Sequence, residues 1–140
     1  MASERYEHFA HGADIGVRGF GPSPAAAFAA AARGLTAVVA DPAAVAAGAK
    51  VAIACRAPTL EFLLVDWLNA VIFEMATRRM LFGRFAVAIA GERLEAEAWG
   101  EAIDVARHAP AVEPKGATMT ELKVECDDSG EWRAQCVIDV

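Results

Sequence analysis

The hydrophobic positions between residues 60 and 75 recur every three or four residues, and this is the most regular pattern in the chain. The spacing places them on one face of an α-helix, as a stripe about four turns long. Phe62, Val65 and Phe73 widen this face, so we expect the helix to be covered on more than one side. Pro58 marks its beginning. The stripe consists of Leu60, Leu63, Leu64, Trp67, Leu68, Val71, Ile72 and Met75.

A second helix is predicted over Pro24–Val39. Ser23 is a favourable N-cap, and Pro24 occupies the first helical position, where its missing N–H has no cost. Apolar residues then follow helical spacing until Asp41-Pro42 ends the segment. These residues are Phe28, Ala31, Leu35, Val38 and Val39.

The other regular segments have the composition and turn boundaries of β-strands. Pairing them mainly as hairpins, with two helices packed against them, predicts an α+β fold. We expect residues 1–140 to form a single two-layer domain, a mostly antiparallel sheet against two helices, with an irregular loop over 101–115. The predicted strands are Tyr6–Phe9, Ile15–Phe20, Val51–Arg56, Leu81–Ala90, Arg93–Gly100, Thr118–Cys126 and Glu131–Asp139.

Charge and composition exclude several classes of protein. The chain has 19 acidic and 13 basic residues, a net charge of −6, so it lacks the basic face that strong nucleic-acid binding requires. Glu61, Asp66 and Glu74 interrupt the long apolar segment, which is therefore a core helix rather than a membrane span. The N-terminus has no secretory signal pattern, so a cytoplasmic location is expected. The three cysteines are widely spaced, and although Cys126 and Cys136 could face each other across a hairpin, we expect reduced thiols.

Two aspartates are the main candidates for a binding site. Asp14 follows a turn and precedes an apolar strand, and Asp139 lies among apolar residues near the other end of the chain. A carboxylate in such surroundings must be solvated, paired or bound to a cation. If the strands that carry them are neighbours, the two carboxylates meet, and their oxygens suit Ca²⁺, Mg²⁺ or Mn²⁺. Spacing alone also allows a turn-capping Asp14 and a solvated Asp139.

Other polar residues give weaker patterns. His8, His11 and Asp14 could form a cluster of two histidines and one carboxylate if the chain turns between them. Lys115 follows a proline turn and reads as a surface lysine or a functional one. Asp104 and His108 are four residues apart and could pair. The sequence shows no nucleophile–base pair, phosphate-binding glycine loop or dinucleotide fingerprint, so nothing indicates an autonomous enzyme.

Taken in order, four motifs resemble the archease family over nearly the whole chain. They are Tyr6-Glu7-His8-Phe9-x-His11-x-Ala13-Asp14-Ile15-Gly16, the helix segment Leu63–Asn69, the loop Gly100-Glu101 with Asp104, His108, Lys115 and Thr118, and the ending Val137-Ile138-Asp139-Val140. Two departures stand out. Gly12 replaces a threonine that is common in the family, and Pro114 and Gly116 flank Lys115 in place of valine and alanine.

The resemblance implies a protein cofactor of an RtcB-type RNA ligase, in tRNA splicing or RNA repair. Such a cofactor promotes GTP-dependent guanylylation of the ligase's active-site histidine and multiple turnover, and it is not an enzyme itself. The family's metal site carries over to Asp14, Asp139 and the main-chain carbonyl of Val140, and a lysine needed for activity matches Lys115. The alternatives are a metal-binding chaperone or scaffold with no effect on nucleotide transfer, and a small metallohydrolase.

Overall fold

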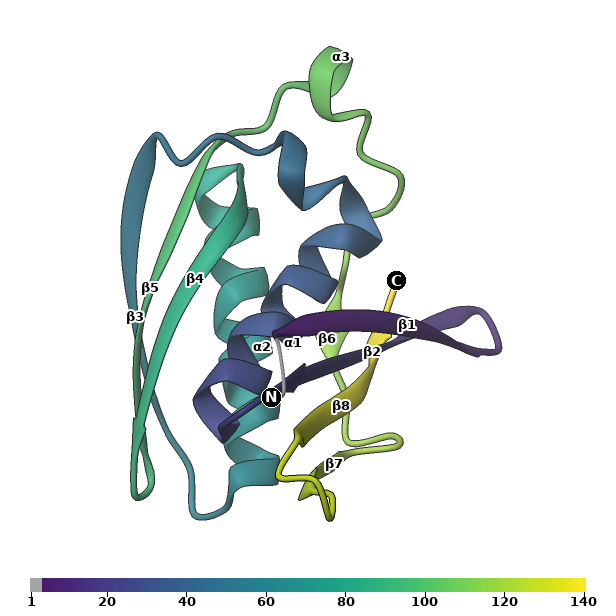
Figure 1. The fold of residues 1–140 in the computed structure, drawn as a ribbon. Coiled ribbons are helices and arrows are strands. Elements are labelled where there is room, and N and C mark those ends of the chain that lie inside the picture. The colour runs from purple at the N-terminus through teal and green to yellow at the C-terminus, as the bar shows by residue number, and fades with distance from the viewer. Residues whose placement is uncertain (1–3) are drawn as a thin grey trace.

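A computed structural model describes residues 4–140 of the chain as two antiparallel sheets with helices between them (Figure 1). The helices are α1 (Pro24–Val39), α2 (Leu60–Arg78) and the single turn α3 (Val105–His108), with a 3-10 turn η1 (Pro42–Ala44) after α1. The strands are β1 (Arg5–His11), β2 (Asp14–Gly21), β3 (Ala49–Arg56), β4 (Met80–Ala90), β5 (Arg93–Ala102), β6 (Gly116–Ala117), β7 (Lys123–Cys126) and β8 (Trp132–Asp139).

The strands divide into a five-stranded and a three-stranded sheet. The first has the order β1-β2-β8-β6, with β7 also paired to β8, and the second has the order β3-β5-β4. The α+β class is confirmed, but α1 and α2 lie between two sheets instead of covering one. None of the helices described over residues 4–140 combines the length and apolarity needed to cross a bilayer.

Helix α1 is narrow enough to touch both sheets because it is rich in alanine. Its predicted bounds are confirmed, and the Ser23 hydroxyl caps it by accepting the N–H of Ala26 at 3.1 Å. Eleven of its sixteen residues are buried, so no face of it is left wholly to solvent. A Cβ added at Gly19 of β2 would lie 2.3 Å from the Ala27 carbonyl oxygen. Strand and helix backbones therefore approach closely at this glycine, where no side chain fits.

Helix α2 carries the predicted apolar stripe but begins two residues after Pro58. Thr59 is the N-cap, and its hydroxyl accepts the Phe62 N–H at 3.2 Å. Val65 is buried, whereas Phe62 and Phe73 are 41% and 62% exposed, so of the three residues expected to widen the apolar face only Val65 joins the core. The sheets cover two sides of α2 and leave a third side to solvent.

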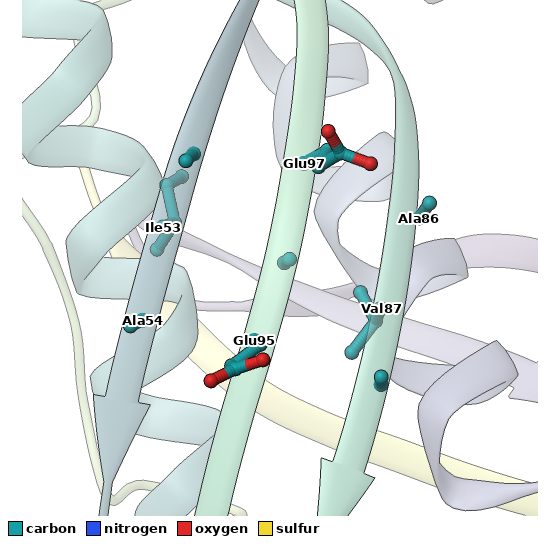
Figure 2. Close-up of a pocket in the computed structure, with 9 residues that line it drawn as sticks. Ile53, Ala54, Ala86, Val87, Glu95 and Glu97 are labelled. Carbon is teal, nitrogen blue, oxygen red and sulfur yellow. The ribbon is translucent and has the colours of Figure 1, made fainter.

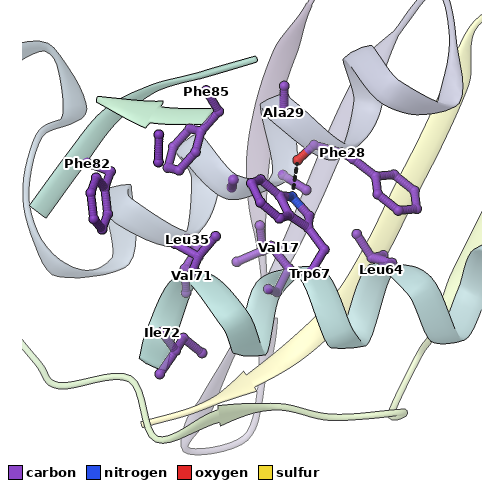
Figure 3. Packing of buried hydrophobic residues seen from close by; sticks show 14 of the residues in the cluster. Val17, Phe28, Ala29, Leu35, Leu64, Trp67, Val71, Ile72, Phe82 and Phe85 are labelled. Carbon is purple, nitrogen blue, oxygen red and sulfur yellow. Dashed lines mark hydrogen bonds between the residues drawn. The ribbon is translucent and has the colours of Figure 1, made fainter. Parts of the chain in front are cut away.

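Trp67 joins the two helices at the centre of the core (Figure 3). Its side chain is fully buried, and its indole N–H donates to the main-chain carbonyl of Phe28 on α1 at 3.0 Å. Its ring meets Phe85 of β4 edge to face, with centroids 5.9 Å apart. Thr36 makes a comparable link, since its hydroxyl donates to the Phe82 carbonyl at 2.6 Å. One core therefore joins both helices to the three-stranded sheet.

The region after β5 differs most from the prediction. The loop over 101–115 contains the turn α3, and the strand predicted over Thr118–Cys126 is reduced to β7, because residues 118–122 form a turn between β7 and the two-residue strand β6. Glu121 in this turn has a left-handed backbone, with φ of 55°. The Gln135 side-chain amide donates to the Glu121 carbonyl at 2.9 Å. Buried Gln135 thus stabilises a turn where sequence alternation suggests a continuous strand.

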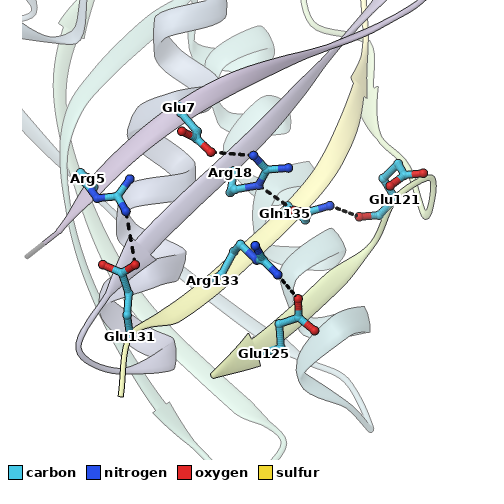
Figure 4. A network of polar contacts seen from close by, with 8 residues as sticks. All are labelled: Arg5, Glu7, Arg18, Glu121, Glu125, Glu131, Arg133 and Gln135. Carbon is cyan, nitrogen blue, oxygen red and sulfur yellow. Dashed lines mark hydrogen bonds and ion pairs between the residues drawn. The ribbon is translucent and has the colours of Figure 1, made fainter. Parts of the chain in front are cut away.

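A polar network crosses the outer face of the five-stranded sheet (Figure 4). Arg18 of β2 is its centre, because its guanidinium donates to Glu7 of β1 at 2.6 Å and to Gln135 of β8 at 2.7 Å. The same guanidinium lies 4.6 Å from the centroid of the Phe9 ring. Side chains as well as main-chain hydrogen bonds therefore hold β1, β2 and β8 together. Arg5 pairs with Glu131 across the same face, and Arg133 with Glu125.

All three cysteines are free thiols, as expected. Cys136 is buried on β8, and burial raises the pKa of its thiol to about 12. Cys126 is exposed at the end of β7 and lies opposite Trp132. The two therefore do not face each other across the closing hairpin, which removes the only disulfide that the sequence suggested.

Replacement of Trp67 tests the core. Trp67→Phe keeps an aromatic ring but leaves the buried Phe28 carbonyl without its donor, so we expect the free energy of unfolding to fall by about 1–3 kcal/mol. Urea denaturation followed by circular dichroism measures it. Trp99→Phe, on the partly exposed outer face of β5, is the matched control and should change stability much less. Equal losses in the two variants would contradict the role given to the indole N–H.

Candidate functional site

The two candidate aspartates lie opposite each other at one end of the five-stranded sheet. Strand β2 pairs with β8 so that Ile15 faces Ile138, and continuing this register by one residue places Asp14 opposite Asp139. On the outer sides of this pair, His11 of β1 faces Asp14 and Gly116 of β6 faces Asp139. The strands β1, β2, β8 and β6 therefore each contribute one residue to a row across the end of the sheet, which we call the aspartate row: His11, Asp14, Asp139 and Gly116. Directly opposed residues of an antiparallel pair project to the same face, so the two carboxylates share a side of the sheet.

Asp14 is oriented by the chain that follows β8. One of its carboxylate oxygens, Oδ1, accepts the main-chain N–H of Val140 at 3.2 Å, which leaves Oδ2 for another partner. Asp14 is half-buried, and Asp139 is exposed and forms no ion pair among the described residues. Like charges placed opposite each other across strands destabilise a sheet. A cation between them would remove this repulsion.

Lys115 is brought to the same end of the sheet by its backbone. Its main-chain N–H donates to the carbonyl of Asp139 at 2.8 Å, immediately before β6 begins. Its side chain is exposed, and its ammonium forms no ion pair over residues 4–140. The lysine is thus held beside the aspartates while its charged end stays available.

Asn69 positions β6 and was not singled out from the sequence as a positioning residue. Its amide oxygen accepts the Ala117 N–H at 2.8 Å, and its amide nitrogen donates to the Ala117 carbonyl at 3.3 Å. One side chain of α2 therefore satisfies both main-chain groups of a two-residue strand. A polar amide within the apolar segment of α2 is the signal that could have revealed this role.

The cluster of His8, His11 and Asp14 does not form. His8 lies in hydrogen-bonding contact with the Gly34 carbonyl of α1, at 2.8 Å from its ring nitrogen Nε2. Within the part of the chain that the structure describes, no three His, Cys, Asp or Glu side chains are grouped closely enough to hold a metal ion. A cation at Asp14 and Asp139 would therefore need a main-chain oxygen, such as the Val140 carbonyl, and water.

Asp104 and His108 belong to a separate cluster around Glu101. The Asp104 main-chain N–H donates to Nδ1 of buried His108 at 2.9 Å, so the ring proton is on Nε2, which donates to Glu101 at 2.9 Å. Glu101 also pairs with Arg107 at 2.6 Å and accepts the Ala46 N–H at 2.8 Å. The hydrogen bond from Arg107 lowers the pKa of Glu101 most, and the bonds from the Ala46 N–H and from His108 lower it further, to about 2. These residues fix the loop after β5 and do not join the aspartates.

A concavity that is separate from the aspartates lies on the other sheet (Figure 2). It has a volume of about 540 Å³ on the outer face of β3, β5 and β4, where Glu95 and Glu97 project between alanine side chains. The two helices separate this face from the sheet that carries Asp14 and Asp139. None of the candidate site residues lines it.

The chemistry available at the aspartate row is that of a hard-cation site. Its donors are carboxylate and main-chain oxygens, which suit Ca²⁺, Mg²⁺ or Mn²⁺ better than Zn²⁺. Two protein carboxylates would leave coordination positions open for water and further oxygen ligands. Lys115 brings a basic residue to the same end of the sheet through its main-chain bond to Asp139.

The support that Asn69 gives to β6 can be tested by removing its amide. Asn69→Leu leaves both main-chain groups of Ala117 without partners, so we expect faster hydrogen exchange at residues 115–117 and a loss of about 1 kcal/mol in stability. Asn69→Asp is the matched control, because it keeps the acceptor for the 2.8 Å bond. Unchanged exchange in Asn69→Leu would show that β6 does not depend on this side chain.

The Glu101 cluster predicts a pH dependence. Since the folded-state pKa is about 2 and the ordinary value is 4.5, ionised Glu101 stabilises the fold above pH 4.5, and this contribution is lost as the pH falls toward 2. Glu101→Gln should therefore lower the melting temperature at neutral pH, and the difference from wild type should shrink on acidification. Thermal unfolding at several pH values measures this. A difference that stays constant across that range would contradict it.

Comparison with known proteins gives concordant results. The model of the Archease protein family matches residues 6–140. A protein named Protein archease from Thermococcus gammatolerans is 36% identical over 97% of this chain and 99% of its own length. One of the same name from Pyrococcus abyssi is 34% identical over 98% and 99%.

Solved structures agree with these matches. The solution structure of Methanobacterium thermoautotrophicum protein 1598 superposes with a TM-score of 0.84, at 27% identity, over 96% of this chain and 98% of that one. The crystal structure of an archease from Thermotoga maritima, described as a possible chaperone, gives 0.62 at 18% identity, over 96% of both chains, and so supports the fold alone. The family match over nearly all of the sequence, together with these relatives, shows that the chain belongs to the archease family.

Proposed function

We propose that Asp14, Asp139 and the main-chain carbonyl of Val140 hold a divalent cation, Ca²⁺, Mg²⁺ or Mn²⁺. The register of β2 and β8, which places the two carboxylates opposite each other, is the observation that carries the proposal. The Val140 N–H bond to Asp14 fixes one carboxylate and directs its second oxygen elsewhere. The donor set contains only oxygen, as these cations prefer.

The protein would act as a cofactor of an RtcB-type RNA ligase in tRNA splicing or RNA repair. In this function it promotes GTP-dependent guanylylation of the ligase's active-site histidine and supports multiple turnover, without being an enzyme itself. Membership of the archease family supports the assignment. So does the net charge of −6, which disfavours direct binding to RNA and leaves a protein as the natural partner.

Each residue at the sheet end has a defined task in this account. A bound divalent cation would offset the negative charge of the GTP phosphates during attack by the ligase histidine. Asp14, which accepts a hydrogen bond from the Val140 N–H, and Asp139 would hold this cation at the nucleotide pocket of the ligase. Lys115, held at this end of the sheet by its main-chain bond to Asp139, has an exposed side chain whose ammonium would contact a phosphate oxygen. Asn69 fixes the strand that follows Lys115.

A second function is a metal-binding chaperone or scaffold that has no effect on nucleotide transfer. The description of the Thermotoga maritima archease as a possible chaperone favours considering it. Such a protein would stabilise a ligase against heat without changing the rate at which the ligase is guanylylated. The two functions therefore differ in their effect on the rate of ligase guanylylation, which can be measured.

Guanylylation of a cognate ligase with limiting GTP is the direct test. Asp14→Asn keeps an oxygen acceptor for the Val140 N–H but removes the charge, so stimulation should fall by about tenfold or more while the fold is unchanged. Asp128→Asn, in the exposed turn after β7, is the control with the same change in net charge. Full stimulation by Asp14→Asn would refute the cation site. A ligase protected from heat but not stimulated by wild type would favour the chaperone.

A further inference from the structure

An apolar pocket of about 420 Å³ lies between the C-terminal end of α2 and the loop that precedes Lys115. Buried side chains of α2 and β4 form its floor. The loop over 110–114, which runs from α3 toward β6, forms its outer wall (Figure 1). The lining residues are Val39, Ile72, Met75, Ala76, Arg79, Leu81, Ile103, Pro110, Val112, Glu113 and Pro114.

The pocket is surrounded by exposed apolar side chains. Ile103 and Val112 in its wall are each 37% exposed, and Val105 on the adjacent turn α3 is 73% exposed. Exposed apolar surface around a concave site is typical of a protein interface. This wall is also anchored, because the Ala111 N–H donates to the Val39 carbonyl at 2.8 Å. The pocket is therefore a fixed feature of the folded chain.

Arg79 and Glu113 are the charged residues among those that line the pocket in the described part of the chain, and neither has an ion-pair partner there. Neither Arg79 nor Glu113 forms an ion pair within residues 4–140, whereas the adjacent Arg78 pairs with Glu74. Their side chains have opposite charges and are both exposed. A ligand that places an anion at Arg79 and a cation at Glu113 would match them.

Arg79 occupies a position that usually belongs to glycine. It caps the end of α2 in the left-handed region, with φ of 53° and ψ of 51°, and its carbonyl accepts the Ile103 N–H at 3.0 Å. Glycine adopts this conformation without steric cost, whereas a residue with a side chain does not. An arginine here is unfavourable for the helix cap, so its side chain is better explained by a contact that the isolated chain does not make.

We propose that this pocket receives a large apolar side chain of the RNA ligase, from a segment that carries a carboxylate facing Arg79 and a basic residue facing Glu113. The inference rests on the proposed function and names its docking surface. The loop over 110–114 leads directly to Lys115, whose main-chain N–H is bonded to Asp139. A ligase segment held in the pocket therefore lies along the same loop as the cation site and orients that site on its partner.

Two variants separate docking from stability. Ala76→Trp places a large side chain at an exposed position that lines the pocket, and Arg79→Gly removes the guanidinium while relieving the left-handed conformation. Thr77→Trp adds the same bulk at the next residue, outside the pocket, and Arg78→Ala removes the neighbouring, paired arginine. Isothermal titration of wild type and the four variants against a cognate ligase gives the affinities, and thermal unfolding checks each fold.

The expected result is a loss of affinity of about tenfold or more for Ala76→Trp and Arg79→Gly, with little change for Thr77→Trp and Arg78→Ala. Arg79→Gly should melt at the same temperature as wild type or higher, which a merely structural arginine would not do. Wild-type affinity in both pocket variants would overturn the docking surface and leave the proposed function intact. Failure of the wild type to bind or stimulate the ligase would overturn the proposed function and this inference with it.

Discussion

The antiparallel pairing of β2 with β8 is the interaction on which the five-stranded sheet and the candidate site depend. It joins a hairpin from the beginning of the sequence to the last strand, and its register sets Asp14 opposite Asp139. Arg18 and Gln135 reinforce it on the outer face, and α1 covers it on the inner face, where Gly19 permits close contact. A shift of one residue would move buried side chains to solvent, so core packing enforces the alignment that brings the two carboxylates together.

Placing α1 and α2 between two sheets has a consequence for function. Small side chains on α1 allow both sheets to approach, and Trp67 ties α2 to α1 at the centre. The three-stranded sheet completes the core and contributes none of the candidate site residues. The candidate site residues Asp14, Asp139 and Lys115 instead lie at the end of the five-stranded sheet and on the loop that leads to it. The fold thus provides a rigid support for one edge, which suits a protein that acts by contacting a partner.

The features that the sequence predicted correctly are those set by local interactions, such as helix ends and hairpins. The bounds of α1 followed from Ser23, Pro24 and the apolar spacing, and the hairpin of β4 and β5 followed from two predicted strands that only two residues separate. Division into two sheets depends on contacts between distant segments, which periodicity does not encode. The same holds for the site. Asp14 and Asp139 could be nominated from their apolar surroundings, but the Asn69 contact with β6 and the His108–Glu101 cluster required the positions of residues far apart in the chain.

In the proposed function, the row formed by β2 and β8 binds a divalent cation. Titration of the ¹⁵N-labelled protein with Mn²⁺ tests it most directly, because a paramagnetic ion broadens the amide signals of residues near it. We expect the signals of Asp14, Gly116, Asp139 and Val140 to disappear first and to persist in Asp14→Asn. Broadening that begins instead around Glu95 and Glu97, or around Asp127 and Glu131, and that is unchanged in Asp14→Asn, would contradict the claim.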